Sequence, residues 1–200
     1  MYKSVFMKLF YILVLFLFVR ANAQTQEQVY DISVNGITVG ELSVSKVIEG
    51  SKTVYKLNSK SVISLFTKTT ITTSLICEFK DNVLEWSTYV SKKNGKPYDN
   101  STITKSDGLY TVTRKEKTTT ISKPIKYLTC MLYFEKPITN ESYFDVLEGV
   151  FSPVKIVDQN NYLYVDSSNN EKTTYNYLNR TLQQGSTKHA LYDFTFTLRR

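Results

Sequence analysis

The chain has 200 residues, of which 25 are Lys or Arg and 18 are Asp or Glu, with one His and a formal charge of +7. Two cysteines and seven glycines exclude a disulfide-dense or collagen-like chain, and a hydrophobic content of 42% argues against global disorder. The length predicts one domain or two small ones.

Residues 1–23 are organised like a secretory signal peptide. Lys3 and Lys8 supply a positive start, an unbroken apolar run extends from Leu9 to Val19, and Ala21-Asn22-Ala23 has the small-x-small form of a cleavage site. The run is shorter than the roughly 20 apolar residues of a membrane span, although an uncleaved anchor is the alternative. We therefore expect an exported protein, periplasmic or secreted, that does not span the membrane after cleavage.

The rest of the chain, residues 24–200, is predicted to be a single β domain. Tyr30, Ile32 and Val34 alternate with polar neighbours, and Asn35-Gly36 follows as a hairpin signal. The alternation slips by one residue near Gly40, which predicts a β-bulge at that glycine.

Further short strands follow at nearly regular spacing. Residues 66–79 are rich in Thr, Ile and Leu, Leu84, Trp86 and Val90 are predicted to share one strand face, and Asn94-Gly95 and Asp107-Gly108 mark turns. The last strands are expected at Val154 to Val157, Tyr162 to Val165, Tyr175 to Leu178 and Phe194 to Leu198. 

One segment departs from this pattern. Residues Tyr127 to Lys136 are better placed for a short helix, which Pro137 would end. The predicted fold is therefore all-β, with a single curved antiparallel sheet of about ten strands. We expect it to form a closed or nearly closed barrel with one short helix that plugs or covers the sheet.

Cys77 and Cys130 are the two cysteines of the chain. Export permits a disulfide, and a bridge between them would stabilise the fold by roughly 3–4 kcal/mol in the chain-entropy interpretation. Cys77 also shares a face with Ile71, Leu75 and Phe79, where it suits a small core residue. The sequence leaves both interpretations open.

Catalytic and metal chemistry find little support. His189 is the sole histidine, and no Ser or Cys lies in a nucleophile-elbow context. The stretch from Asp166 to Glu171 has oxygen ligands at alternate positions, but it lacks the glycine and distant glutamate of a calcium loop and suits a hairpin turn. A glycosidase pair among Asp145, Glu148 and Asp158 would need facing carboxyls that spacing cannot show. We therefore predict no enzyme, catalytic residue, cofactor or metal site.

Nucleic acid is not an expected partner, because the lysines are scattered along the strands and form no dense basic stripe. Aromatic residues on predicted strands are the more informative feature. In a small barrel they fill the interior, and in a wider one they line a cavity for an apolar ligand. The candidate ligand-binding residues are Tyr55, Trp86, Tyr164, Tyr177 and Phe196.

Four stretches of the chain resemble a family of secreted, functionally uncharacterised β proteins of Gram-negative bacteria. They are residues 30–42, with a Tyr-rich strand and two glycines four residues apart, and residues 132–137, 162–164 and 175–178. The resemblance implies an exported lipocalin-like or lipoprotein-carrier-like β fold and no catalytic residues. Asn179-Arg180 departs from it, because the family tends to have a Gly turn there.

Two functions are expected from these features. The first is non-catalytic binding of a lipid or another apolar or amphipathic molecule inside the barrel, since aromatic strands are present and a catalytic constellation is not apparent. The alternative is a structural or protein-interaction module of the cell envelope, with an envelope protein as partner. A hollow interior favours the first function, whereas a packed interior favours the second.

Overall fold

The computed structural model describes residues 23–64, 67–188 and 193–200. Nearly all of the predicted signal peptide, residues 1–22, lies outside the described residues, as does His189. In the described part, fourteen strands form one antiparallel sheet in the order β8-β7-β6-β5-β4-β3-β2-β1-β14-β13-β12-β11-β10-β9. The strands are β1 Gln24–Val34, β2 Ile37–Glu49, β3 Lys52–Ser64, β4 Lys68–Lys80, β5 Val83–Lys93, β6 Lys96–Ser106, β7 Leu109–Arg114, β8 Lys117–Ile121, β9 Ser142–Asp145, β10 Val150–Ile156, β11 Asn161–Val165, β12 Lys172–Leu178, β13 Thr181–Lys188 and β14 Asp193–Leu198.

The predicted hairpins are confirmed, and turn chemistry explains them. Asn35 and Gly36 between β1 and β2 have φ values of 49° and 79°, and Asn94-Gly95 and Asp107-Gly108 also have positive φ at both positions. Two-residue turns of this left-handed kind match the right-handed twist of the strands they join. Asn179 and Arg180 adopt the same conformation between β12 and β13, so a hairpin forms there without glycine.

The β-bulge predicted at Gly40 is also confirmed. Ile32 pairs with Gly40 and Ser33 pairs with Thr38, which leaves Val39 as the extra residue on β2. A Cβ on Gly40 would lie 2.1 Å from the Lys60 carbonyl oxygen of β3, closer than any side chain can approach. Glycine is therefore required where β2 bends against β3.

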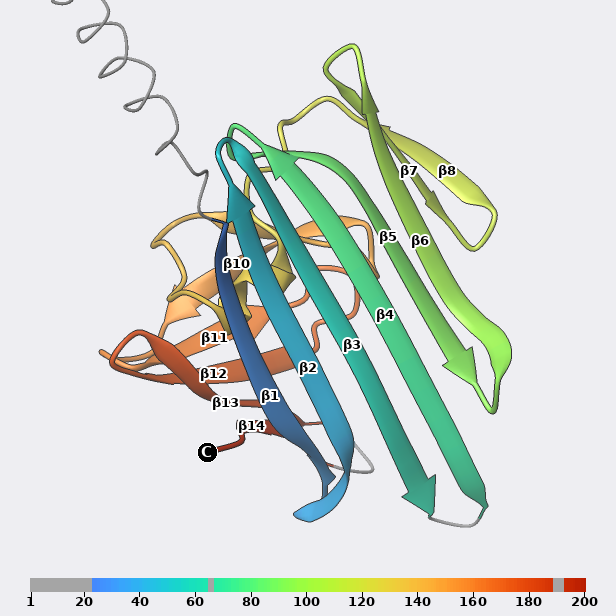
Figure 1. The fold of residues 1–200 in the computed structure, drawn as a ribbon, viewed down its shortest axis with the longest axis vertical. Helices are drawn as coiled ribbons and strands as arrows, with labels where there is room; N and C mark the ends of the chain where they lie inside the picture. The colour runs from blue at the N-terminus through green and yellow to red at the C-terminus, as the bar shows by residue number, and fades with distance from the viewer. Residues whose placement is uncertain (1–22, 65–66, 189–192) are drawn as a thin grey trace, which may run out of the picture.

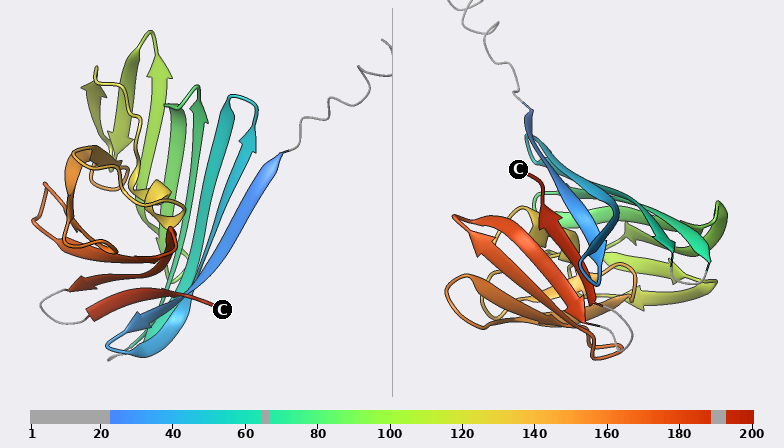
Figure 2. Two further views of the ribbon diagram at one scale, coloured as in Figure 1. Left: turned by 90° about the vertical axis from the view of Figure 1, so that its left-hand side faces the viewer. Right: turned by 90° about the horizontal axis from the view of Figure 1, so that it is seen from below.

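The sheet curls around itself, but it is not closed. The long strands β1–β5 form one wall, and β10–β14 form a second wall that crosses behind it (Figures 1 and 2). β8 and β9 are the two ends of the sheet and do not pair with each other. The expectation of about ten strands in a closed or nearly closed barrel therefore requires correction, to fourteen strands in an open, barrel-like sheet.

Part of the connection from β8 to β9 is buried in the interior of the curled sheet. Its central residues Thr129–Tyr133 form the short 3-10 helix η1, where a longer helix was expected, and Cys130, Met131 and Leu132 of this helix are buried. Tyr177 on β12 donates a hydrogen bond of 2.6 Å to the Leu132 carbonyl oxygen. A tyrosine of the sheet thus supplies a hydrogen bond to a backbone carbonyl of η1.

Two apolar clusters meet at η1 and make up the core. Met131 belongs to the cluster that contains Tyr55 and Phe79, while Leu132 belongs to the cluster that contains Tyr30 and Phe196. Buried side chains therefore fill the interior on both sides of η1. In the described part of the chain, no helix is long and apolar enough to cross a membrane.

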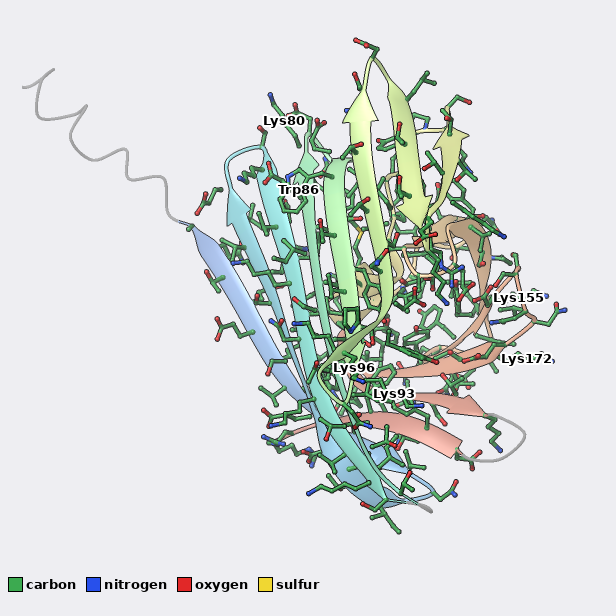
Figure 3. All side chains as sticks on the ribbon, turned by 90° about the vertical axis from the view of Figure 1, so that its right-hand side faces the viewer. Lys80, Trp86, Lys93, Lys96, Lys155 and Lys172 are labelled. Carbon is green, nitrogen blue, oxygen red and sulfur yellow. The ribbon has the colours of Figure 1, made fainter. Side chains whose placement is uncertain are left out.

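Trp86 does not face this interior, contrary to the expectation. Phe79 pairs with Leu84, but Glu78 pairs with Trp86, so Glu85 is an extra residue on β5. This bulge reverses the alternation, and Leu84 is buried while Trp86 and Val90 are each 36% exposed on the outer face. Figure 3 shows Trp86 on that face together with lysines such as Lys80 and Lys93.

Candidate functional site

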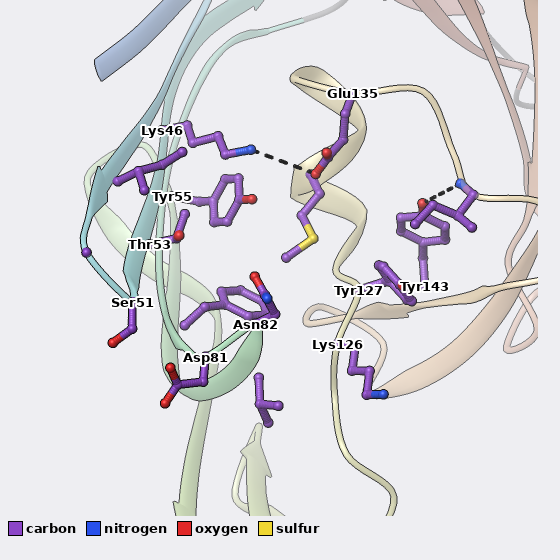
Figure 4. A pocket seen from close by; sticks show the side chains of 16 residues that line it. Lys46, Ser51, Thr53, Tyr55, Asp81, Asn82, Lys126, Tyr127, Glu135 and Tyr143 are labelled. Atoms are coloured by element: carbon purple, nitrogen blue, oxygen red, sulfur yellow. Dashed lines mark hydrogen bonds and ion pairs between the residues drawn. The ribbon is translucent and has the colours of Figure 1, made fainter. Parts of the chain in front are cut away.

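A cleft of about 690 Å³ opens at the end of the molecule where the β2–β3 and β4–β5 turns meet the β8–β9 connection. We call it the end cleft (Figure 4). The Asp81 amide donates a hydrogen bond of 2.9 Å to the Ser51 carbonyl oxygen, which joins the two turns. Its lining residues are Lys46, Ile48, Gly50, Ser51, Thr53, Tyr55, Phe79, Asp81, Asn82, Val83, Lys126, Tyr127, Met131, Glu135, Ile138 and Tyr143.

The floor of the end cleft is apolar and aromatic. The Tyr55 and Phe79 rings meet edge to face with centroids 5.7 Å apart, and both residues are buried with Met131. Tyr127 and Tyr143 form a second aromatic pair, with centroids 5.5 Å apart. Such a surface suits the apolar body of a small molecule.

The rim carries charges of both signs. Lys46 Nζ lies 3.9 Å from Glu135 Oε1 and 5.5 Å from the centroid of the Tyr55 ring. Lys126 and Asp81 also line the cleft (Figure 4). At 3.9 Å the Lys46–Glu135 ion pair is at the limit of direct contact, so the ammonium is available to a competing anion.

Lys46 and Glu135 also line a neighbouring hollow of about 540 Å³ with Gln28 and Arg180. The ion pair therefore stands between two hollows that share the same rim. A ligand that displaces Glu135 from Lys46 has room to extend from one hollow into the other.

The hydroxyl of Tyr55 is the most informative polar group of the end cleft. Tyr55 is only 3% exposed, and its hydroxyl has no hydrogen-bond partner among the described residues. Burial is the main cause that raises the pKa of Tyr55 above its ordinary value, so the hydroxyl keeps its proton. The hydroxyl oxygen opens into the cleft, where a ligand atom or water can form a hydrogen bond with it.

The five predicted ligand-binding residues do not line one cavity. Tyr55 lies on the floor of the end cleft, whereas Tyr164 lines a separate pocket of about 310 Å³. Tyr177 and Phe196 are buried in the core, and Trp86 lies outside. Phe196 packs on Gly185, where an added Cβ would lie 1.9 Å from Phe196 Cζ.

Cys77 and Cys130 come together although 52 residues separate them in the sequence. Both are free thiols and both are buried, one on β4 and one in η1. Burial is the main cause that raises the pKa of the Cys77 thiol, and the neighbouring Cys130 thiol raises it further. The structure therefore places the two sulfur atoms as neighbours, and the disulfide remains a prediction.

Lys46 is a functional candidate that the sequence pattern did not predict. Leu42 and Val44 are buried on the inner face of β2, and Lys46 is the next residue of the same alternating series. A lysine at an inward position of a strand was the available signal. Met131 and Tyr127 gave no comparable signal, because they reach the cleft only through the path of the β8–β9 connection.

Comparison with known proteins identifies a family and a fold. The sequence profile of DUF6134, a domain of unknown function, matches residues 30–199. A crystal structure of a beta-barrel-like protein of the domain of unknown function DUF1849 from Brucella abortus is similar in fold, with a TM-score of 0.55 and 10% sequence identity. The similarity covers 90% of this chain and 98% of that chain. No curated protein matched the sequence.

Proposed function

Because the chain belongs to the DUF6134 family, a domain of unknown function, we propose a function from the end cleft itself. The protein is a non-catalytic binding protein that holds an amphipathic small molecule. The observation that supports this proposal best is the Tyr55 hydroxyl, which opens into the cleft beside an apolar floor and has no hydrogen-bond partner among the described residues. A ligand atom that accepts or donates a hydrogen bond there would satisfy it.

The charges suggest how the molecule is oriented. Its apolar body rests on Phe79 and Met131, and an anionic head group replaces Glu135 at the Lys46 ammonium. The Lys46 side chain is already held over the Tyr55 ring, so little conformational entropy is lost when it meets the anion. An acyl chain with a carboxylate head has this chemistry.

Export is a second part of the proposal. Residues 1–23 and the family resemblance support a periplasmic or secreted protein of a Gram-negative bacterium. Fractionation of cells that express the full sequence, with the intact mass of the protein, tests this. We expect the exported fraction to contain a chain that begins at Gln24, and full-length protein in the cytosol would contradict it.

Dodecanoate is the probe for the end cleft. Protein expressed from the full sequence is titrated with dodecanoate by isothermal titration calorimetry below its critical micelle concentration. Tyr55→Phe removes only the hydroxyl and should weaken binding about threefold to tenfold, a range typical of one hydrogen bond. Lys46→Met should weaken binding by about tenfold or more, because the head group loses its cation.

Matched controls come from outside the cleft. Tyr98→Phe removes a hydroxyl from a residue that is 62% exposed. Lys52→Met removes an ammonium at the start of β3 that pairs with Glu78 of β4. Both should bind dodecanoate as the unmodified protein does. The proposal fails if saturating dodecanoate produces no heat and native mass spectrometry of the purified protein shows no bound amphiphile.

The alternative function, protein interaction in the cell envelope, has its own supporting observation. β8 is an end strand of the sheet, and Lys117, Thr118, Thr119 and Thr120 are all exposed. An uncovered strand edge offers backbone hydrogen bonds to an extended segment of another protein. A photo-crosslinker at Thr119 should then yield one defined adduct in cells, and a matched crosslinker at exposed Thr174 on β12 should not.

A further inference from the structure

A second pocket, separate from the end cleft, has an unusual concentration of negative charge. It measures about 310 Å³ and lies between η1, the β9–β10 turn and the β11–β12 turn. We call it the acidic pocket. Its described lining contains no Lys or Arg and consists of Leu57, Leu75, Thr129, Cys130, Tyr133, Asp145, Leu147, Glu148, Tyr164, Asp166, Asn169, Glu171, Thr173 and Tyr175.

Four carboxylates on this lining belong to a chain with an excess of basic residues. Arg114 neutralises Glu148 through a bidentate ion pair. Asp145 Oδ1 accepts hydrogen bonds of 2.7 and 3.2 Å from the Leu147 and Glu148 amides. Its Oδ2 atom accepts one long bond of 3.3 Å, from the Tyr164 hydroxyl, so Oδ2 retains the capacity for a stronger donor.

Tyrosines supply the rest of the recognition surface. Tyr133, Tyr164 and Tyr175 each line the acidic pocket. Tyr175 is 7% exposed, and its hydroxyl has no hydrogen-bond partner among the described residues. This hydroxyl opens into the pocket, where a ligand can donate a hydrogen bond to it or accept one from it.

The carboxylates do not converge as metal ligands do. Among the described residues, no group of three or more His, Cys, Asp or Glu is arranged to hold a metal ion. Acidic groups that are spread around a pocket with aromatic walls suit a larger cation, since aromatic faces and carboxylates together attract ammonium groups. A volume of about 310 Å³ is at the lower end of the range for small-molecule sites, so the ligand is small.

We infer that the acidic pocket binds a small primary ammonium ion. Its N–H groups donate to Asp145 Oδ2 and to the Tyr175 hydroxyl, and its alkyl part contacts Leu57 and Leu75. A primary amine fits better than a quaternary one, because a quaternary ammonium has no N–H to donate to either acceptor. This site is independent of the end cleft, so either proposal can fail while the other stands.

The probe for this inference is 1,4-diaminobutane, titrated by calorimetry at pH 7 into protein that is expressed from the full sequence. Tyr175→Phe removes the unpartnered hydroxyl and should weaken binding about threefold to tenfold. Asp145→Asn keeps an acceptor for the two turn amides, removes the charge, and should weaken binding by tenfold or more. Asp107→Asn, in the β6–β7 turn where asparagine suits the positive φ, is the charge-matched control and should bind normally.

Three further measurements distinguish a primary ammonium ligand from a quaternary ammonium, a calcium ion and a folding defect. Choline should bind at least tenfold more weakly than the diamine, and equal binding overturns the assignment to a primary ammonium. Calcium chloride should produce no saturable heat, and saturable calcium binding that Asp145→Asn abolishes overturns an organic ligand. If Asp145→Asn does not fold, as judged by its thermal transition, Tyr175→Phe alone decides: unchanged diamine affinity overturns the site.

Discussion

Arg114 at the end of β7 and Glu148 in the turn after β9 form a bidentate ion pair, with Nη1–Oε2 and Nη2–Oε1 distances of 2.8 and 3.0 Å. They belong to the two ends of a sheet that does not close. The ion pair therefore connects two ends of the sheet that are not joined by hydrogen bonds between strands. The side chains are 26% and 28% exposed. Because they are partly buried, water and salt screen their attraction less than they would screen a fully exposed pair.

Breaking this pair should loosen the two ends of the sheet. A double-mutant cycle of Arg114→Met and Glu148→Gln should give a coupling of about 1 kcal/mol in urea unfolding, and 1 M NaCl should reduce it. Hydrogen exchange should rise in β7, β8 and β9. The Lys52–Glu78 pair, on adjacent paired strands at 2.9 Å, is the control and should affect none of these strands. A coupling near zero would contradict the joining role.

Gly185→Ala should destabilise the core around Phe196. An added Cβ would lie 1.9 Å from Phe196 Cζ, and the ring cannot retreat freely because it packs against Tyr30, Tyr133 and Tyr175. We expect a loss of about 1–3 kcal/mol in the free energy of unfolding, as for other overpacked cores.

Two variants test the cause of that loss. Gln184→Ala, the exposed neighbour on β13, should change stability by less than about 0.5 kcal/mol. Phe196→Leu should cost less in the Gly185→Ala background than alone, because the smaller side chain relieves the clash. Additive costs would show that the contact with Phe196 is not the reason.

Oxidation should join Cys77 to Cys130. If the protein is exported to an oxidising compartment, intact mass should show the loss of two hydrogens, and thiol titration in denaturant should find no free thiol. The bridge should raise the free energy of unfolding by roughly 3–4 kcal/mol, because it ties η1 to β4 and closes a long loop. Cys130→Ser, which cannot form the bridge, should match the reduced protein within about 1 kcal/mol. Two alkylatable thiols in the exported protein would contradict this.

Asp145 should make stability depend on pH. Burial is the main cause that raises the pKa of its carboxyl, although the Leu147 and Glu148 amides act in the opposite direction. The folded protein therefore holds this proton more tightly than the unfolded chain does. In the unfolded chain, the pKa of an Asp carboxyl is about 4. The contribution of Asp145 to stability is therefore present below about pH 4, and it is lost as the pH rises through the higher pKa of the folded protein.

The variant Asp145→Asn cannot ionise, so it should gain stability relative to the unmodified protein as pH rises from about 4 to 7. Urea unfolding at several pH values measures the difference. Asp158 is the control of opposite sign, because hydrogen bonds from Asn160 and Asn161 lower the pKa of its carboxyl. Asp158→Asn should lose relative stability as pH rises. A constant difference for Asp145→Asn would contradict the buried-carboxyl interpretation.

Local chemistry made much of the fold predictable. Asn-Gly and Asp-Gly dipeptides favour left-handed turn conformations, and alternation of apolar and polar residues predicts half-buried strands wherever both persist. β13 was missed because its inward positions include Gly185 and Thr187, which carry little apolar signal. Their small size is explained by Phe196, a residue of the next strand that fills the space above Gly185.

The candidate sites were less predictable, for a related reason. Tyr55 and Tyr164 are both aromatic strand residues, yet they line different hollows. Because Glu85 is an extra residue on β5, Trp86 lies on the outer face of the sheet. A bulge of one residue reverses every later position of a strand, and the sequence alone does not show whether a slip in alternation is a bulge or a polar core position.

The sequence by itself determined that this chain forms antiparallel strands joined by tight turns, because those preferences act between neighbours along the chain. Only the tertiary structure decided that fourteen strands curl without closing and that the β8–β9 connection fills the interior. The end cleft and the acidic pocket were decided in the same way. Each depends on contacts between residues far apart in sequence, whose free energies arise from packing and burial that no local pattern records.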